Sequence, residues 1–250
     1  MNEAVGDPIT RDTLLGGRVR LSQPKNGFRA AIDPVFLAAA LPAIAGETIL
    51  DVGSGTGAAA LCLAARVPGV DATGIEIDAA LVALANANAA ESGFAGRVRF
   101  VAGDVLAPPA GLIGKVFDHV LTNPPFSARG AGSPSPDAGK RQATVEGKGG
   151  IEAWLVACLA FLKPGGSLTL IHRADRLDAV LAGLAGRAGG IVVFPLWPAA
   201  GKAAKRVIVA ARKGSIAPLD MRPGLVLHQA GGDYTAGAEA ILRDGRALIF

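Results

Sequence analysis

The sequence predicts an α/β fold in which helices cover both faces of a mostly parallel, Rossmann-like sheet. From residue 47 onward, short apolar runs alternate with segments rich in alanine and leucine. Several of these runs are continuously apolar, which is typical of strands buried on both faces of a parallel sheet. The segments between them carry helical spacing, and a regular alternation of strand and helix indicates a doubly wound sheet.

Seven apolar runs supply the expected strands, and turn-forming or polar residues bound most of them. In chain order they are ETILDVG (47–53), DATGIEID (71–78), VRFVAGD (98–104), FDHVLTN (117–123), GSLTLIHR (166–173), IVVFPLW (191–197) and KRVIVAAR (205–212). The expected helices are AAALCLAARV (58–67), AALVALANANAAE (79–91) and IEAWLVACLAFL (151–162). The KPGG that follows the last of these is a helix stop, so the fifth strand begins there.

The segments on either side of the sheet pattern are expected to pack on the sheet. Residues 1–46 form a small N-terminal cap, with a helix in which Asp33 is the N-cap and Pro34 takes the first position. Residues 47–213 form the main domain. Residues 214–250 extend it with an extended segment, a turn and a short last helix.

Composition bears on the cellular location of the protein and on the kinds of partner it can bind. No apolar segment reaches the ~18 residues of a membrane-spanning helix, and the N-terminus lacks the basic and apolar regions of a secretory signal. Cys62 and Cys158 lie in helical text and are expected to be reduced, buried thiols, which favours a cytoplasmic location. The net charge of +4 permits a polyanionic partner without requiring one. No His/Cys/carboxylate cluster has metal-ligand spacing, so no metal is expected.

Polar residues follow four successive strands: Asp51, Glu76, Asp104 and Asn123. Ligands of open α/β sheets bind outside the carboxyl ends of the strands, so these side chains are expected to line one crevice. The first strand runs into DVGSGTG (51–57), whose glycine spacing is GxGxG rather than the GxGxxG of a dinucleotide fingerprint. Such a turn alone also suits a tight strand-to-helix connection without a ligand.

In this order, DVGSGTG, GIEID, VAGDV and LTNPPF resemble the motifs of class I S-adenosylmethionine-dependent methyltransferases, over roughly residues 20–213. The resemblance implies a seven-stranded, mostly parallel sheet whose last strand is antiparallel, and S-adenosyl-L-methionine as the cofactor. It implies cofactor contacts from the first strand and its turn, the second strand end and the third strand end. These residues are Asp51, Gly53, Ser54, Gly55, Thr56 and Gly57 for the methionine part, Glu76 and Ile77 for the ribose, and Asp104 and Val105 for the adenine.

The stretch HVLTNPPF (119–126) ends a strand with two prolines, which remove two backbone donors and fix two φ angles. In the family, N-P-P-[FYW] marks enzymes that methylate an amide nitrogen or an exocyclic amine. The Asn123 side chain, which also borders the cofactor, and the Pro124 carbonyl are expected to accept the two N–H bonds of that nitrogen. Pro125 stiffens the turn, and Phe126 is expected to stack on a base.

The start QPKNGFRAAIDPVFLAA and the C-terminal part resemble bacterial methyltransferases that modify the adenine beside the anticodon of a valine tRNA. The resemblance makes tRNA the expected partner and adenine N6 the expected target. It also implies that Gln23, Phe28, Arg29 and Asp33 border the cofactor. Basic residues are expected to hold the RNA backbone, namely Lys140, Arg141, Lys202, Lys205 and Arg206.

Several alternatives stay open at this point. A protein glutamine N5-methyltransferase or a small-molecule N-methyltransferase carries the same motif, although glutamine enzymes have a separate helical domain for which the N-terminal segment leaves no room. A non-catalytic RNA-binding module on the same fold is the third possibility. Residues 127–149 are rich in Gly, Ser and Pro, and form an ordered lid, a binding loop or a disordered segment. Trp197 lines the target pocket or belongs to the core, and the sequence does not separate monomer from dimer.

Overall fold

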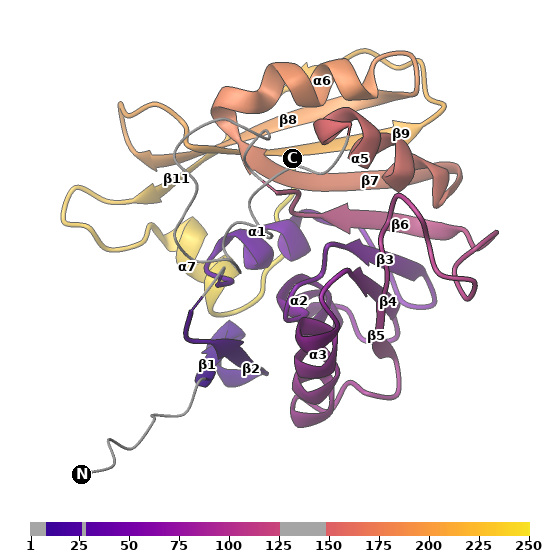
Figure 1. The fold of residues 1–250 in the computed structure, drawn as a ribbon. Coiled ribbons are helices and arrows are strands. Elements are labelled where there is room, and N and C mark those ends of the chain that lie inside the picture. The colour runs from indigo at the N-terminus through magenta and orange to yellow at the C-terminus, as the bar shows by residue number, and fades with distance from the viewer. Residues whose placement is uncertain (1–8, 27–28, 126–148) are drawn as a thin grey trace, which may run out of the picture.

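The computed structural model describes residues 9–26, 29–125 and 149–250, and its main body is one sheet covered by helices on both faces (Figure 1). The nine strands lie in the order β10-β8-β9-β7-β6-β3-β4-β5, and β11 also pairs with β8. Their bounds are β3 Thr48–Val52, β4 Asp71–Glu76, β5 Val98–Ala102, β6 Phe117–Thr122, β7 Leu162–Arg173, β8 Ala188–Ala199, β9 Arg206–Lys213, β10 Asp220–Met221 and β11 Leu225–His228.

The seven strands expected from the sequence are confirmed as β3 to β9. All described pairs within this sheet are parallel except those of β9, which runs antiparallel to both β7 and β8. The last of the seven strands is therefore antiparallel, as the family resemblance implied. The two strands beyond this set, β10 and β11, are short and both lie parallel to β8.

The helices divide between the two faces because successive side chains of a strand point to opposite sides. Ile49 and Leu121 belong to one core cluster, with α1 (Asp33–Ala40), α2 (Ala58–Arg66), α3 (Ala79–Glu91) and α7 (Ala236–Leu242). Leu50 and Val120 belong to the other, with α5 (Gly150–Ala160) and α6 (Leu177–Leu184). Two 3₁₀ turns, η1 Leu15–Gly17 and η2 Ala174–Arg176, complete the described elements.

The N-terminal segment contains an antiparallel hairpin of β1 (Ile9–Leu14) and β2 (Val19–Pro24), which the sequence did not predict. The buried amide of Asn88 on α3 fixes it: Asn88 Oδ1 accepts the Ser22 N–H at 2.8 Å, and Asn88 Nδ2 donates to the Ser22 carbonyl at 3.1 Å. Asn88 Nδ2 also donates to the Thr56 carbonyl at 3.0 Å. One side chain thus ties the hairpin to the glycine-rich turn.

The expected capping role of Asp33 is wrong. Asp33 is the first residue of α1 and its side chain caps no backbone N–H; it accepts a hydrogen bond from Arg206 Nε at 2.8 Å instead. Asp78 does cap α3, accepting from the N–H groups of Ala80 and Leu81.

The C-terminal segment packs on the rest of the chain. Leu248 N–H donates to the Ala39 carbonyl at 2.9 Å, and the Phe250 ring lies 5.4 Å from that of Phe194. The division at residues 46 and 213 stays a prediction. Within the described ranges, every helix is too short or too polar to cross a membrane.

Candidate active site at the carboxyl edge of the sheet

A cavity of about 350 Å³ opens where the carboxyl ends of β3, β4 and β6 meet. Four parts of the chain line it: the segment before α1, the glycine-rich turn after β3, the residues after β4, and the residues after β6. They are Pro24, Asn26, Ala30, Pro34, Asp51, Gly53, Ser54, Gly55, Thr56, Ala58, Ala59, Glu76, Ile77, Asp78, Ala80, Leu81, Asn123, Pro124 and Pro125. Its walls are mostly apolar with a few convergent polar groups, as is usual for a small-molecule site.

The glycine-rich turn needs glycine for two reasons. Gly53, Gly55 and Gly57 have φ values of 71°, 54° and 86°, a region that side chains disfavour. A Cβ on Gly57 would also lie 2.6 Å from the Phe100 ring. The Glu76 carboxylate holds the turn, because its Oε2 accepts the Gly55 N–H at 2.9 Å. The turn therefore presents its backbone to the cavity.

Asp51 is the most strongly perturbed acid of this cavity. Its side chain is buried, and its Oδ2 accepts the Ala60 N–H at 3.2 Å. Burial is the main cause that raises the pKa of Asp51 to about 7. The Ala60 hydrogen bond lowers this pKa and the Glu76 charge raises it, each by less than burial does. A cation beside this carboxyl group would lower that pKa and stabilise the carboxylate.

Two polar atoms at the cavity are buried without a hydrogen-bond partner in the described chain: Asn123 Oδ1 and Ser54 Oγ. Buried polar atoms are normally paired, so such atoms at a cavity wall indicate places for ligand groups. Asn123 directly follows β6, and Pro124 and Pro125 fix the backbone after it.

A buried side-chain relay joins the two strand ends that carry these groups. Trp154 Nε1 on α5 donates to Thr122 Oγ1 at 3.0 Å, and Thr122 Oγ1 donates to the Val52 carbonyl at 2.8 Å. A Cβ on Gly53 would lie 3.0 Å from the Trp154 ring. Trp154 and Thr122 therefore brace the residues immediately before both the glycine-rich turn and Asn123.

Of the described N-terminal residues expected at the cofactor, Gln23, Arg29 and Asp33 do not line the cavity. Gln23 is buried, and its side-chain amide pairs with the N–H and carbonyl of Ala30 at 2.8 and 3.3 Å. Arg29 pairs with Asp12 at 2.8 Å. Of this segment, Pro24, Asn26, Ala30 and Pro34 line the cavity instead. The assignment of Gln23, Phe28, Arg29 and Asp33 to the cofactor stays a prediction.

Asp104 and Val105 lie outside the lining of this cavity. Asp104 Oδ1 accepts the Leu106 N–H at 2.8 Å, and Val105 lines a neighbouring, more open hollow beside α5. Their assignment to the adenine stays a prediction.

The basic candidates separate into two groups. Lys202 and Lys205 are exposed on the turn between β8 and β9. Arg206 was expected to hold RNA, but its guanidinium pairs with Asp33, so it joins β9 to α1. Phe28, Phe126, Lys140 and Arg141 lie outside the described residues. In the part of the chain that the structure describes, no group of three His, Cys, Asp or Glu side chains is placed to hold a metal.

The cavity fits S-adenosylmethionine in its chemistry. Asp51 and Glu76 offer carboxyl oxygens to an ammonium or a sulfonium and to ribose hydroxyls, and the exposed Ile77 and half-buried Leu81 offer apolar surface to a base. The open backbone of the turn and the unpaired Ser54 hydroxyl suit the amino-acid part.

Comparison with known proteins agrees with this geometry. Residues 31–138 match the family model of the methyltransferase small domain. A tRNA1(Val) (adenine(37)-N6)-methyltransferase of Porphyromonas gingivalis is 39% identical over 51% of this chain and 50% of its own length, so the chain spans about half of that relative. An enzyme of the same name from Shewanella amazonensis is 29% identical over 87% of this chain and 91% of its own length.

Other relatives carry a different name. A release factor glutamine methyltransferase of Moorella thermoacetica is 34% identical over 53% of this chain and 48% of its own length. A solved structure from Agrobacterium tumefaciens, described as a predicted O-methyltransferase, has a TM-score of 0.72 and 26% identity over 87% of this chain and 98% of its own. Sheet order, cavity and the match of residues 31–138 to the methyltransferase small domain agree with the fold and the cofactor of class I S-adenosylmethionine-dependent methyltransferases.

Proposed function

We propose that the protein is an S-adenosylmethionine-dependent N-methyltransferase that modifies the exocyclic N6 of an adenine in tRNA, beside the anticodon, in the cytoplasm. The observation that carries the proposal is the buried Asn123 Oδ1 at the cavity wall, which has no partner in the described chain. An oxygen held in this way accepts an N–H of a substrate without first breaking another hydrogen bond. Two prolines behind it keep the backbone fixed.

The chemistry requires such an acceptor because the lone pair of an adenine amine is delocalised into the ring. When bound, S-adenosylmethionine supplies an electrophilic methyl group on a sulfonium sulfur. Asn123 Oδ1 and the Pro124 carbonyl accept the two N–H bonds of the amine and turn its lone pair toward that methyl group. Held in this way, the amine nitrogen would take up the methyl group and would release one of its protons to water. Pre-organised acceptors of this kind stabilise the developing positive charge.

The choice of tRNA is supported by the names of the relatives that match most of this chain and by the exposed Lys202 and Lys205. Ammonium groups on a surface turn attract phosphates in a salt-dependent way. Bases of a single-stranded loop can be splayed out and held individually, which gives a protein access to the target amine.

A second candidate is methylation of a glutamine side chain in a protein, which the release-factor relatives favour. The same fork at Asn123 and Pro124 accepts the two N–H bonds of a primary amide. The two candidates differ in the partner that the surrounding surface meets.

One experiment separates them. The protein is incubated with methyl-labelled S-adenosylmethionine and either total tRNA that lacks base methylation or a release factor. The proposal expects label in N6-methyladenosine of the tRNA after digestion to nucleosides, and none in the release factor. Label in glutamine alone supports the second candidate, and label in neither contradicts both.

A further inference from the structure

A second hollow, of about 550 Å³, lies at the tip of the β8–β9 hairpin, and we call it the hairpin groove. Its lining consists of Trp197, residues 199–203 and Val226. It shares no lining residue with the cavity at Asn123. Four of its seven lining residues are alanine or glycine, so Trp197, Lys202 and Val226 supply its larger side chains.

Trp197 offers its ring rather than its hydrogen-bonding edge. Its Nε1 donates to the Pro223 carbonyl at 2.9 Å, so its one polar atom is already paired. The indole is half-buried and forms part of the groove wall, which leaves an aromatic surface for contact. A stacked aromatic contact tolerates any nucleobase, because every base has a π face.

The charge around the hairpin groove is positive. Lys202 is one of the lining residues, and Lys205 follows on the same turn. Both are exposed, and no carboxylate belongs to the groove lining. The nearby arginines differ, since Arg206 pairs with Asp33 and Arg173 pairs with Asp175. Lys202 and Lys205, both on the described turn between β8 and β9, are therefore placed to meet a phosphate.

A pair of stacked rings lies beside the groove. His228 is opposite Ala199 in the pairing of β11 with β8, and its Nδ1 contacts the Pro198 carbonyl at 3.0 Å. The His228 and Tyr234 rings are stacked with centroids 4.7 Å apart. The end of β8 thus combines aromatic surface with positive charge, which is the combination that single-stranded nucleic acid selects.

The distance from the groove to the catalytic fork suits a continuous strand of RNA. The carboxyl ends of β8 and β6 lie at the same edge of the sheet, with β9 and β7 between them. Three strand spacings of about 4.8 Å amount to about 14 Å across the sheet, and the register adds about 10 Å along the strands, because Leu196 is level with Arg173 whereas Thr122 is level with Leu170. A stacked single strand advances about 3.4 Å per nucleotide, so about five nucleotides cover the resulting span of roughly 17 Å.

We infer that the hairpin groove is a subsite for a nucleotide flanking the target in single-stranded RNA, with the base on Trp197 and a phosphate at Lys202. The inference rests on the proposed action on RNA. It adds a binding site that the methyl-transfer chemistry itself does not need.

The direct test follows tryptophan fluorescence during titration with an RNA hairpin that carries the target adenine in its loop. The chain has two tryptophans, Trp154 and Trp197, so wild type is compared with Trp197→Phe. We expect RNA to quench wild-type emission and to leave the emission of Trp197→Phe nearly unchanged. Equal quenching in both proteins, or RNA binding without any quenching, overturns the inference.

A kinetic test uses a substrate too short to reach the groove. For Trp197→Ala we expect kcat/KM on the RNA hairpin to fall roughly 10-fold, the effect of losing one stacked base, and to change less than about twofold on a trinucleotide centred on adenine. Lys202→Ala is expected to lower the salt dependence of binding by a slope of about 1. Lys115→Ala, an exposed lysine in the loop that leads to the start of β6, is the matched control and should change neither.

The outcomes separate the two hypotheses. Wild-type methylation of the hairpin with unchanged kinetics in Trp197→Ala and Lys202→Ala contradicts the groove but leaves the proposed function standing. Equal loss on hairpin and trinucleotide also contradicts the groove, because the variant would then act through the fold. No methylation of any RNA by wild type contradicts the proposed function itself.

Discussion

Asn123 combines a buried, unpaired side-chain oxygen with a backbone that two following prolines hold in place. Because this oxygen is proposed to act on the substrate amine, Asn123→Ala should lower kcat by a factor of about 10² or more. The dissociation constant of S-adenosylmethionine, measured by calorimetry, should change by less than about threefold. A loss of donor affinity as large as the loss of turnover would remove Asn123 from the catalytic role.

Asp51 is expected to bind the donor at the expense of the stability of the ligand-free protein. Its folded pKa of about 7 lies above the ordinary value of 3.8, so its contribution to stability is complete below about pH 4 and is lost as the pH rises through 7. Asp51→Asn has no charge to bury. The stability advantage of this variant should therefore grow by about 2 kcal/mol between pH 5 and pH 8, as measured by urea unfolding of the ligand-free protein.

The same substitution should weaken donor binding at pH 8, since the cationic donor loses a carboxylate partner. Stability and affinity are thus expected to move in opposite directions, which is the signature of a binding residue rather than a packing residue. If Asp51→Asn destabilises the ligand-free protein equally at both pH values, the raised pKa is refuted.

The ends of β3 and β6 are held in register by the relay from Trp154 through Thr122 to the Val52 carbonyl. Thr122→Val keeps the shape but leaves a buried donor and a buried acceptor unpaired, at a cost of about 1–3 kcal/mol each. We expect kcat to fall about tenfold under conditions where the variant is fully folded, because the fork at Asn123 loses its support. Thr122→Ser, which retains the hydroxyl, should restore most of the activity. If Thr122→Val has the kcat of wild type, the relay only stabilises the fold.

Elements defined by local pattern were predictable, and elements defined by distant partners were not. The continuous apolar runs identified β3 to β9, and the polar residues at their ends identified Asp51, Glu76 and Asn123. The β1–β2 hairpin escaped prediction because its strands are half-polar and because Asn88, 66 residues from Ser22, sets its position. The pairing of Arg206 with Asp33 escaped prediction for the same reason, since the two residues lie 173 positions apart.

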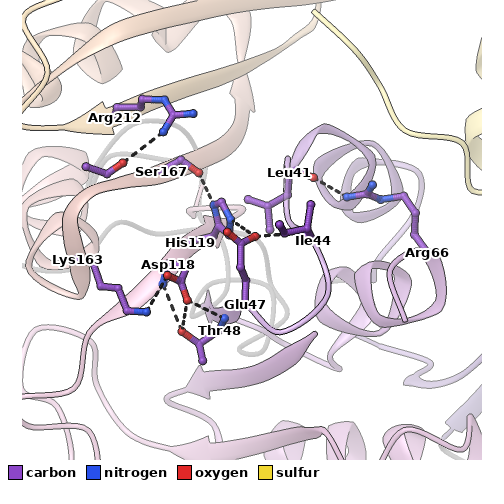
Figure 2. A network of polar contacts seen from close by, with 11 residues as sticks. Leu41, Ile44, Glu47, Thr48, Arg66, Asp118, His119, Lys163, Ser167 and Arg212 are labelled. Carbon is purple, nitrogen blue, oxygen red and sulfur yellow. Dashed lines mark hydrogen bonds and ion pairs between the residues drawn. The ribbon is translucent and has the colours of Figure 1, made fainter. Parts of the chain in front are cut away.

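The two edges of the sheet differ in the polar groups that they carry. The carboxyl edge carries the cavity, whereas a polar network joins the strands at the opposite edge, around the starts of β3, β6 and β7 (Figure 2). There Asp118 accepts hydrogen bonds from Lys163 at 2.7 Å and from the Thr48 hydroxyl at 2.8 Å. His119 lies between Ser167 and Glu47, at 2.6 and 2.9 Å. These contacts join neighbouring strands, and Ser167 and His119 are buried within the sheet.

The contribution of Asp118 at this edge to the free energy of unfolding should depend on pH. Burial alone would raise the pKa of Asp118, but the hydrogen bonds from Lys163 and Thr48 outweigh it and lower the pKa to about 2. Its contribution is therefore present above the ordinary value of 3.8 and is lost as the pH falls through 2. Asp118→Asn should lower the free energy of unfolding by about 1 kcal/mol at pH 7. The difference from wild type should shrink toward pH 2, and urea unfolding at both pH values measures it. Its kcat should match wild type at pH 7, because the substitution lies at the far edge.

The central claim is that a rigid pair of oxygens at residues 123 and 124 faces the methyl group of the donor. A crystal structure with S-adenosylhomocysteine and adenosine tests it most directly. We expect the sulfur and the adenosine amine to meet at the Asn123 side chain, with the amine hydrogen-bonded to Asn123 Oδ1 and to the Pro124 carbonyl. A sulfur directed away from Asn123, or an amine bound elsewhere in the cavity, would contradict it.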